Sequence, residues 1–310
     1  MNVLVTGGAG YIGAVLVPAL LAEGHNVTVI DNFMYQQVPL MDCCHDKKLK
    51  VVRGDVRDRK LLGEHVSKAD AVLPLACLTG APICARDPEA AKAVNFDAVK
   101  AVAELMGPKQ MIIFPCTNSG YGIGQAHIHC DEDSPLRPVS VYGRLKVEIE
   151  SFLLNNCNCL TFRFATLFGV SPRMRLDLLV NDFTYRAVTD RYLVLFEPHF
   201  KRNYLHVRDA AGVFLHGLNH FERMKGRPYN VGLSDANLSK WELCERIKQH
   251  VPDLAVMISE LGQDPDKRNY IVSNERIEST GFKTAFSLDD GIDELVKGYQ
   301  ILPRGQFSNV

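Results

Sequence analysis

A glycine-rich turn at the start of the chain constrains its fold more than any other feature. The apolar run VLVT is followed by Gly7, Gly8, Gly10 and Gly13, and then by an apolar helical run. Two spacings fit, one beginning at Gly7 and one at Gly8. Glycines at these steps permit a tight turn and let the backbone approach a diphosphate, with helix N–H groups directed at its charge. The segment therefore predicts a strand, a dinucleotide-binding turn and a helix.

An acidic residue ends the next predicted strand. Asp31 closes the run NVTVID, and Asn32 rather than an arginine follows it. A carboxylate there accepts hydrogen bonds from the ribose hydroxyls of adenosine and repels a 2′-phosphate, so we expect NAD rather than NADP as the cofactor. A helix-capping role for Asp31 is the alternative. Asp55 and Val56 follow the third strand, where an adenine contact is expected, although Asp55 also suits a plain turn.

The apolar runs of the first half alternate with helical stretches. The runs are NVLVTG, NVTVID, KVVRGDV, AVLPLA, QMIIFPCT and CLTFRFAT. This alternation predicts an α/β fold with a doubly wound parallel sheet of the Rossmann type, with roughly six or seven strands. The pattern becomes less regular after Phe168. We expect an NAD-binding domain over residues 1–168, with returns near residues 203–220, and a smaller C-terminal substrate-binding lobe over residues 169–310.

Composition excludes several classes of partner. The chain has 35 Lys and Arg against 36 Asp and Glu, so no overall field attracts nucleic acid or an anionic membrane. The N-terminus lacks the features of a secretory signal, and no apolar run is long enough to span a bilayer, so we expect a soluble cytoplasmic protein. No CxxC pair occurs among the nine cysteines, and we expect no metal site.

A tyrosine and a lysine stand four residues apart in a predicted helix over about residues 140–154. Tyr142 and Lys146 therefore share one helix face. A neighbouring cation favours the phenolate, so Tyr142 is a candidate base near neutral pH. By itself the pair is also typical of a solvated helix face. Thr117, which ends the strand MIIFPC and begins TNSGYG, adds a candidate hydroxyl.

Three motifs together resemble the extended short-chain dehydrogenase/reductases, and specifically their nucleotide-sugar epimerase/dehydratase group. TGGAGYIG, TNSGYG and YGRLK match this group in order and spacing, and the resemblance covers residues 1–302. It implies that Tyr142 abstracts the proton of a sugar hydroxyl, that Thr117 orients that hydroxyl, and that Lys146 lowers the pKa of the phenol and holds the nicotinamide ribose. With the residues above, the cofactor candidates are Gly7, Gly10, Tyr11, Ile12, Gly13, Asp31, Asn32, Asp55, Val56, Leu75, Ala76, Asn95 and Lys146.

The same resemblance also implies which residues bind the nucleotide-sugar. Arg202 in RNYLHV stands where members carry an arginine that meets the diphosphate, and Arg268 in DPDKRNY stands where a second one is expected. Guanidinium groups suit bidentate contact with phosphate. The candidate substrate residues are Asn118, Ser119, Thr166, Arg173, Arg202 and Arg268.

Departures from the group's usual residues narrow the reaction. The 4,6-dehydratases follow their active-site Thr with Asp-Glu, whereas this chain has Asn118 and Ser119, so dehydration lacks its proton carriers. Ser119 also replaces the cysteine of the 3,5-epimerases that act on GDP-sugars. Thr166 stands in place of an Asn that many epimerases use. We expect neither a dehydratase nor a 3,5-epimerase.

Longer runs resemble one subgroup, the bacterial GDP-heptose 4-dehydrogenases that feed capsule heptose synthesis. The runs are SPRMRLDLLVNDFTYRAVTDRYLVLF, FPCTNSGYGIG and DPDKRNYIVSN. A UDP-hexose 4-epimerase, which shares the same triad, is the alternative, and a non-catalytic NAD-binding regulator is a further one. The family also implies a homodimer paired through helices, for which the apolar stripes of residues 90–106 and 141–154 are candidates.

Overall fold

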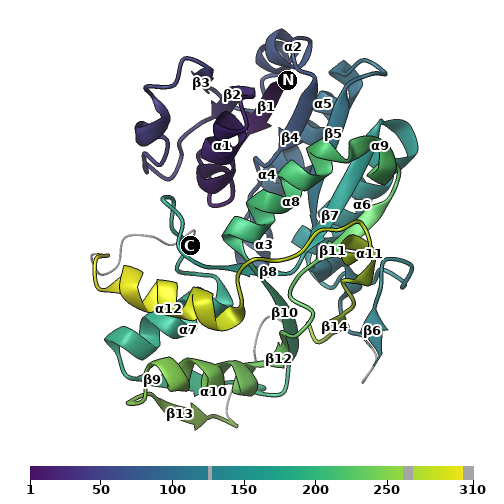
Figure 1. Cartoon of the computed structure of the whole chain (residues 1–310). Coiled ribbons are helices and arrows are strands. Elements are labelled where there is room, and N and C mark those ends of the chain that lie inside the picture. Colours follow the sequence, from purple (N-terminus) through teal and green to yellow (C-terminus); the bar gives the residue numbers. More distant parts are fainter. Residues whose placement is uncertain (125–127, 261–267, 303–310) are drawn as a thin grey trace.

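Parallel strands build the central sheet of the larger lobe (Figure 1). Within the described residues, which are 1–124, 128–260 and 268–302, these strands are β1 (Asn2–Thr6), β2 (Asn26–Asp31), β3 (Leu49–Arg53), β4 (Ala71–Pro74), β5 (Met111–Thr117), β7 (Cys159–Phe164) and β11 (Pro228–Val231). Their order is β11-β7-β5-β4-β1-β2-β3. The chain therefore starts in the middle of the sheet and winds outward in both directions, which brings the carboxyl ends of all these strands to one edge.

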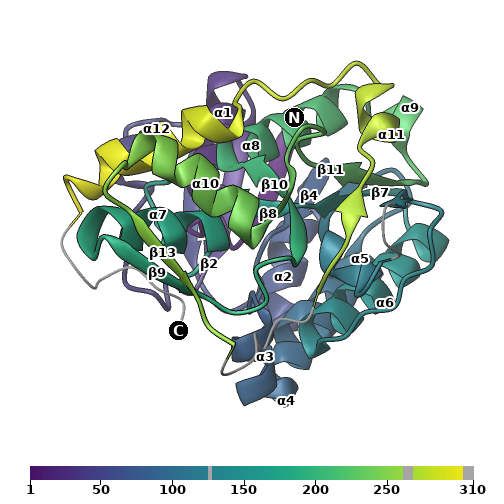
Figure 2. The same cartoon turned by 90° about the horizontal axis from the view of Figure 1, so that it is seen from below.

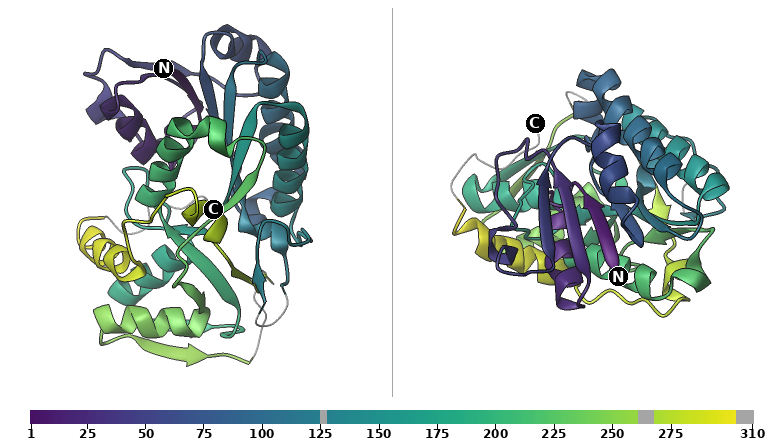
Figure 3. Two further views of the ribbon diagram at one scale, coloured as in Figure 1. Left: turned by 45° about the vertical axis from the view of Figure 1, so that its right-hand side comes forward. Right: turned by 90° about the horizontal axis from the view of Figure 1, so that it is seen from above.

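Helices cover both faces of this sheet (Figure 3). One face packs against α1 (Gly13–Ala22) and α8 (Val207–Asn219), and the other against α2 (Arg59–Val66), α5 (Ala98–Leu105) and α6 (Val141–Asn156). The middle strands are apolar runs because they are buried on both sides, as in β4, whose four residues are all buried. Polar caps fix where two of the helices begin. Asp58 accepts hydrogen bonds from the N–H groups of Lys60 and Leu61, and Ser140 accepts one from Gly143.

The smaller lobe has its own core, in which three helices pack side by side (Figure 2). The helices are α7 (Leu179–Thr189), α10 (Lys240–His250) and α12 (Leu288–Tyr299), and the strands are β8 (Thr166–Phe168), β9 (Tyr192–Leu195), β10 (Lys201–His206), β12 (Asn237–Ser239) and β13 (Ala255–Ile258). Strand β10 pairs in parallel with β8 and antiparallel with β12, and β9 pairs with β13. Reciprocal capping boxes at Ser239 and Ser287 begin α10 and α12.

Shorter elements complete the chain. They are α3 (Ala81–Arg86), α4 (Pro88–Lys92), α9 (Phe221–Met224), α11 (Glu275–Glu278), β6 (His129–Cys130), β14 (Ile271–Val272), the 3-10 turns η1 (Met41–Cys43) and η3 (Asn118–Tyr121), and the π-helical turn η2 (Ala93–Asp97). Strands β6 and β14 pair in parallel beside the sheet.

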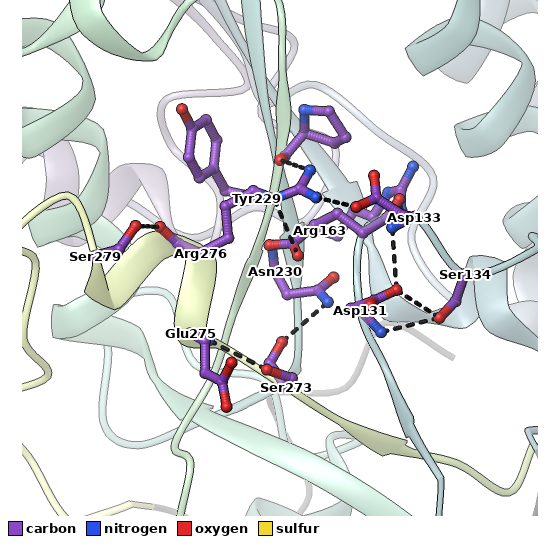
Figure 4. Close-up of polar contacts among 12 residues, drawn as sticks. Asp131, Asp133, Ser134, Arg163, Tyr229, Asn230, Ser273, Glu275, Arg276 and Ser279 are labelled. Atoms are coloured by element: carbon purple, nitrogen blue, oxygen red, sulfur yellow. Dashed lines mark hydrogen bonds and ion pairs between the residues drawn. The ribbon is translucent and has the colours of Figure 1, made fainter.

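A buried polar network joins these short elements to β7 and β11, and Figure 4 shows the part of it in which Asn230 contacts Ser273. The guanidinium of Arg163 forms an ion pair with Glu150 at 2.8 Å and donates to the hydroxyl of Tyr121 at 3.1 Å. That hydroxyl donates to Asn230 Oδ1 at 2.7 Å, and Asn230 Nδ2 donates to the carbonyl of Ser273. Buried charges need such partners, so the network holds η3, which begins directly after Thr117, in one position.

The Rossmann-type α/β fold predicted from the sequence is confirmed. Near residues 203–220 the chain returns to the larger lobe as α8, which packs on the sheet, while β10 joins the separate sheet of the smaller lobe. The last strand of the large sheet, β11, lies beyond that range. The return to the large sheet therefore extends to Val231.

The apolar stripes proposed for a dimer are partly used within the chain. Val99 and Val102 of α5 and Ile149 and Leu153 of α6 are buried against the sheet. The homodimer therefore stays a prediction that rests on the resemblance. None of the helices in the described ranges is long and apolar enough to cross a membrane. Within those same ranges, no three His, Cys, Asp or Glu side chains are grouped as metal ligands would be.

Candidate active site

A cavity of about 880 Å³ lies between the carboxyl ends of the sheet strands and the smaller lobe. This volume is near the upper end of the usual range for ligand pockets, about 300–1,000 Å³, so the cavity suits a large ligand. Most of the site residues predicted from the sequence line it. Those lining residues are Gly7, Gly10, Tyr11, Ile12, Gly13, Asp31, Asn32, Asp55, Val56, Leu75, Ala76, Thr117, Ser119, Tyr142, Lys146, Thr166, Arg173, Arg202 and Arg268.

The glycine-rich turn has no room for side chains at two of its positions. Gly7 has a φ of 71°, and a Cβ there would lie 2.5 Å from the backbone nitrogen of Ala76. A Cβ on Gly13 would lie 2.4 Å from the carbonyl oxygen of Gly8. The turn is therefore packed tightly against the end of β4, and the first N–H groups of α1 are held at the cavity wall. This is the arrangement that the backbone of a diphosphate-binding turn requires.

Asp31 connects the glycine-rich turn to the loop after β2 at one end of the cavity, which we call the cofactor end. Its Oδ2 accepts a hydrogen bond from the N–H of Ala9 at 2.9 Å, and its Oδ1 accepts one from Phe33 at 2.8 Å. A carboxylate oxygen has a second acceptor site, so these bonds leave capacity for ribose hydroxyls. The structural role and the ribose-binding role are thus compatible at this position.

Asp55 is tied to its own turn. It forms an ion pair with Arg57 at 2.7 Å and accepts the Arg57 N–H at 2.9 Å. These hydrogen bonds lower the pKa of Asp55 to about 2. Asp55 therefore stays ionised at the end of the cavity where adenosine is expected, and Asn32, which also lines the cavity, is exposed.

Two predicted site residues do not line the cavity. Asn95 is 1% exposed and lies behind the wall, where its side chain accepts from the N–H of Leu78 at 2.8 Å and donates to the Leu78 carbonyl at 2.9 Å. It fixes the loop whose residues Cys77 and Leu78 do line the cavity. Asn118 is also 1% exposed, and within the described part of the chain its amide atoms have no hydrogen-bond partner.

The catalytic candidates come together at the other end of the cavity. Thr117 ends β5, and its hydroxyl lies 3.0 Å from that of Ser119 and accepts the Ser119 N–H at 3.1 Å. Lys146 is buried one helical turn after Tyr142, and its Nζ donates to the carbonyl of Pro115 at 2.8 Å. Strand β5 and helix α6 thus present a hydroxyl, a phenol and an ammonium to one space.

The surroundings of Tyr142 differ from the expectation in one respect. Loss of water around the phenol raises the pKa of Tyr142 well above its usual value, and the charge of Arg175 acts against this shift. Lys146 was expected to have that effect. Its predicted influence on the phenol remains a prediction, while Arg175 is a site residue that the motifs did not reveal.

Arg175 belongs to a charged pair at the cavity wall. Its Nη2 lies 2.5 Å from Asp177 Oδ2, both side chains are mostly buried, and both residues line the cavity. Alternating charges in an otherwise apolar segment, RMRLDLL, were the available signal. Tyr35, from the loop after β2, also lines the cavity and was likewise missed.

The two arginines expected at the diphosphate are connected to each other and to the catalytic end. Arg202 donates to the carbonyl of Arg268, and the guanidinium of Arg268 donates to the hydroxyl of Ser119. Arg268 therefore reaches the residue that is hydrogen-bonded to Thr117. A phosphate would meet Arg268 only after this contact is rearranged or shared.

Comparisons with known proteins agree with this geometry. The model of the NAD-dependent epimerase/dehydratase family matches residues 3–232. A UDP-glucose 4-epimerase of Mycolicibacterium smegmatis is 30% identical over 227 residues, which are 69% of this chain and 72% of that protein. A dTDP-glucose 4,6-dehydratase of Streptomyces niveus is 25% identical over 97% of this chain and 93% of its own length. The structure of a Bacillus cereus UDP-glucuronic acid 4-epimerase with UDP-glucuronic acid and NAD superposes with a TM-score of 0.86 at 20% identity, covering 97% of this chain and 99% of that chain.

Proposed function

This chain belongs to the NAD-dependent epimerase/dehydratase family, and from that premise we propose that it oxidises the 4-hydroxyl of a nucleotide-sugar. One observation carries the proposal: Thr117, Tyr142 and Lys146 line the same cavity as the glycine-rich turn and Asp31. The cofactor is NAD. The residues fit it, because Gly7 and Gly13 let the turn pack closely against neighbouring backbone at the cavity wall and Asp31 keeps acceptor capacity.

The chain's own residues then act on the sugar hydroxyl. When bound, NAD supplies the ring that accepts a hydride from the sugar carbon. Tyr142 receives the hydroxyl proton at its phenolic oxygen, and Thr117 holds the hydroxyl in position by a hydrogen bond. Lys146 adds a positive charge beside the site and holds the nicotinamide ribose. Because burial raises the pKa of Tyr142, the cations around it are needed for the phenolate to form near neutral pH.

The finer proposal is a GDP-heptose 4-dehydrogenase of surface-polysaccharide synthesis. Its support is the likeness of the longer runs and the absence of the dehydratase acid and base, since Asn118 and Ser119 follow Thr117. Asp177, an acid of the cavity wall, is held in the pair with Arg175. The carboxylic acid pair that a dehydration step uses therefore does not follow Thr117.

A UDP-hexose 4-epimerase is the second candidate. The UDP-glucose 4-epimerase relative of M. smegmatis favours it, and epimerisation begins with the same oxidation before the hydride returns to the other face. A non-catalytic NAD-binding regulator is disfavoured. Such a protein does not need Thr117, Tyr142 and Lys146 in one cavity.

A panel of GDP- and UDP-sugars tests these proposals directly. We expect the purified protein with NAD to convert at least one of them, with GDP-heptose the best substrate and NADH absorbance rising as the 4-keto sugar forms. Conversion of a UDP-hexose to its 4-epimer without net NADH establishes the second candidate instead. Binding of NAD with no conversion of any nucleotide-sugar contradicts both enzymatic proposals.

A further inference from the structure

We propose that Arg173, stacked on Tyr35 above the glycine-rich turn, binds the diphosphate of NAD and slows release of the cofactor; this inference rests on the proposed NAD-dependent function. The sequence resemblance placed Arg173 with the substrate residues. The structure places it at the cofactor end of the cavity, for three reasons that concern its anchoring, its stacking and its charge.

The segment that carries Arg173 is anchored to the glycine-rich turn. The hydroxyl of Tyr11 donates to the carbonyl of Gly169 at 2.6 Å, and the hydroxyl of Ser171 donates to the carbonyl of Tyr11 at 2.8 Å. Arg173 in turn donates its N–H to the Ser171 hydroxyl at 3.4 Å. These bonds join parts of the chain about 160 residues apart, and they place the arginine directly beside the turn.

The side chain of Arg173 lies across the loop that follows Asp31. Its guanidinium carbon is 4.0 Å from the centroid of the Tyr35 ring, the residue is 2% exposed, and both residues line the cavity. Stacking uses the face of the guanidinium and directs its N–H groups outward in the plane, where Nη1 donates to the Met174 carbonyl at 3.3 Å and the planar fork suits phosphate oxygens. Asp31 is among the charges that act on Arg173, so the guanidinium lies near the acid of the ribose site.

The charge of the turn itself supports the same assignment. The residues from Gly7 to Gly13 offer backbone N–H groups but no cationic side chain, whereas a dinucleotide diphosphate carries two negative charges. Arg57 is paired with Asp55, and Lys146 donates to the Pro115 carbonyl at the end of the cavity that holds Tyr142. Arg173 donates from Nη1 to the carbonyl of Met174 at 3.3 Å and stands on the segment that is hydrogen-bonded to the glycine-rich turn. Burial and the nearby Arg175 lower the pKa of Arg173, so an anion placed against it is stabilising.

Tyr35 adds a second contact on the same side. Its hydroxyl oxygen is buried and, within the described residues, has no hydrogen-bond partner. The loop that carries it holds Phe33 and Gln36 at a φ of 54°, a left-handed conformation that costs about 1–2 kcal/mol for residues other than glycine. Such strain is maintained only where the surroundings require the loop shape. The loop shape here brings Tyr35 under Arg173.

Ligands of increasing phosphate content test the assignment. Calorimetry on the full chain measures the affinities of adenosine, ADP-ribose and NAD for the parent and for Arg173→Gln, and stopped-flow fluorescence measures the release of NADH. We expect Arg173→Gln to weaken ADP-ribose and NAD by about 10- to 100-fold, the size of a lost charge-assisted hydrogen bond, and to speed NADH release. Adenosine affinity should not change.

Further variants keep the test decisive. Arg53→Gln is the matched control, because Arg53 also lies over an aromatic ring of this loop, at 5.2 Å from Phe33, but is exposed and outside the cavity lining. It should bind NAD as the parent does. Tyr35→Phe keeps the stacking and should lose less affinity than Tyr35→Ala. If Arg173→Gln does not fold, Arg173→Lys keeps the charge without the planar fork and should show an intermediate loss of diphosphate affinity.

Several outcomes would overturn the proposal. The proposal is wrong if Arg173→Gln binds ADP-ribose and NAD with parental affinity. It is also wrong if the variant loses as much affinity for adenosine as for NAD, because that result indicates a structural role for Arg173. If Arg173→Gln loses affinity only for GDP or UDP, Arg173 belongs to the substrate site, and the proposed function is unaffected. Failure of the parent protein to bind NAD at all is a different result, because it contradicts the proposed function itself.

Discussion

The cofactor end and the sugar end of the cleft are built in different ways. At the cofactor end, Asp31 is hydrogen-bonded to Ala9 and Phe33, which are 22 and 2 residues away in the chain. At the sugar end, the hydroxyl of Ser119 meets Arg268, which is 149 residues away. The contacts that hold Asp31 therefore join segments near each other in the sequence, whereas the contact between Ser119 and Arg268 depends on long-range packing. Substitutions at the first end should alter binding and folding, and those at the second should alter the rate.

The largest effect is expected for Tyr142→Phe. The change removes only the oxygen that accepts the proton, so turnover on the best nucleotide-sugar should fall by about 10²–10⁴-fold while NAD affinity and melting temperature stay near parental values. Steady-state kinetics and calorimetry measure both. Tyr192→Phe on β9, which is 54% exposed, is the control and should leave turnover unchanged. Near-parental turnover of Tyr142→Phe would refute the oxidation mechanism.

The next effect concerns the turn, where Gly7→Ala should lower stability. The new Cβ would clash with the Ala76 backbone nitrogen at 2.5 Å, so we expect the free energy of unfolding to fall by about 2–4 kcal/mol and the affinity for NAD to decrease. Gly226→Ala is the matched control, since Gly226 has a φ of 77° but no atom within 4 Å of the added Cβ. Its cost should be about 1 kcal/mol. If chemical denaturation gives the same loss of unfolding free energy for Gly7→Ala and Gly226→Ala, the close packing of the turn does not contribute to stability.

A smaller effect is expected for Asp31→Ala. Loss of an acceptor for the ribose hydroxyls should weaken NAD by about 10-fold and relax the exclusion of NADP, because the repulsion of the 2′-phosphate disappears. Titration of both cofactors by calorimetry measures this. Asp46→Ala is the control, because Asp46 makes the same local bond, to the N–H of Lys48 at 2.8 Å, away from the cavity. If the Asp31 variant binds NAD and NADP as the parent does, Asp31 only holds the backbone of Ala9 and Phe33 and does not bind the ribose.

The smallest effect is a change in pH dependence for Arg175→Gln. Phenolate forms above the pKa of Tyr142, and Arg175 is a cation that lowers this pKa. Removing the charge raises the pKa further, so the rise of kcat with pH should move to higher pH, while kcat on the alkaline plateau changes little. Arg191→Gln, at an exposed ion pair with Asp253, should leave the profile in place. If the pH profile of kcat does not shift in Arg175→Gln, Arg175 does not set the pKa of Tyr142, and Lys146 is the remaining candidate for that effect.

The sequence predicted the sheet and most residues of the cavity, but not all of their roles. Strand runs, glycines and the spacing of Tyr142 and Lys146 are short-range patterns, and the structure follows them closely. Asn95 and Asn118 were also predicted as site residues, but both are buried and neither lines the cavity. A motif gives a residue's place on an element, and the packing of neighbouring loops decides whether its side chain reaches the cavity.

The sequence alone determined the dinucleotide turn, the acid at the end of β2 and the positions of the proposed catalytic hydroxyl, phenol and lysine, because each depends on backbone geometry within one strand, turn or helix. Only the tertiary structure decided that Arg175 acts on Tyr142 and that Arg173 lies on Tyr35 beside the turn. Those contacts join loops from different lobes, and they form only when the two cores pack around a common cleft. Charge interactions across a cavity depend on distance and burial, which no local pattern of residues encodes.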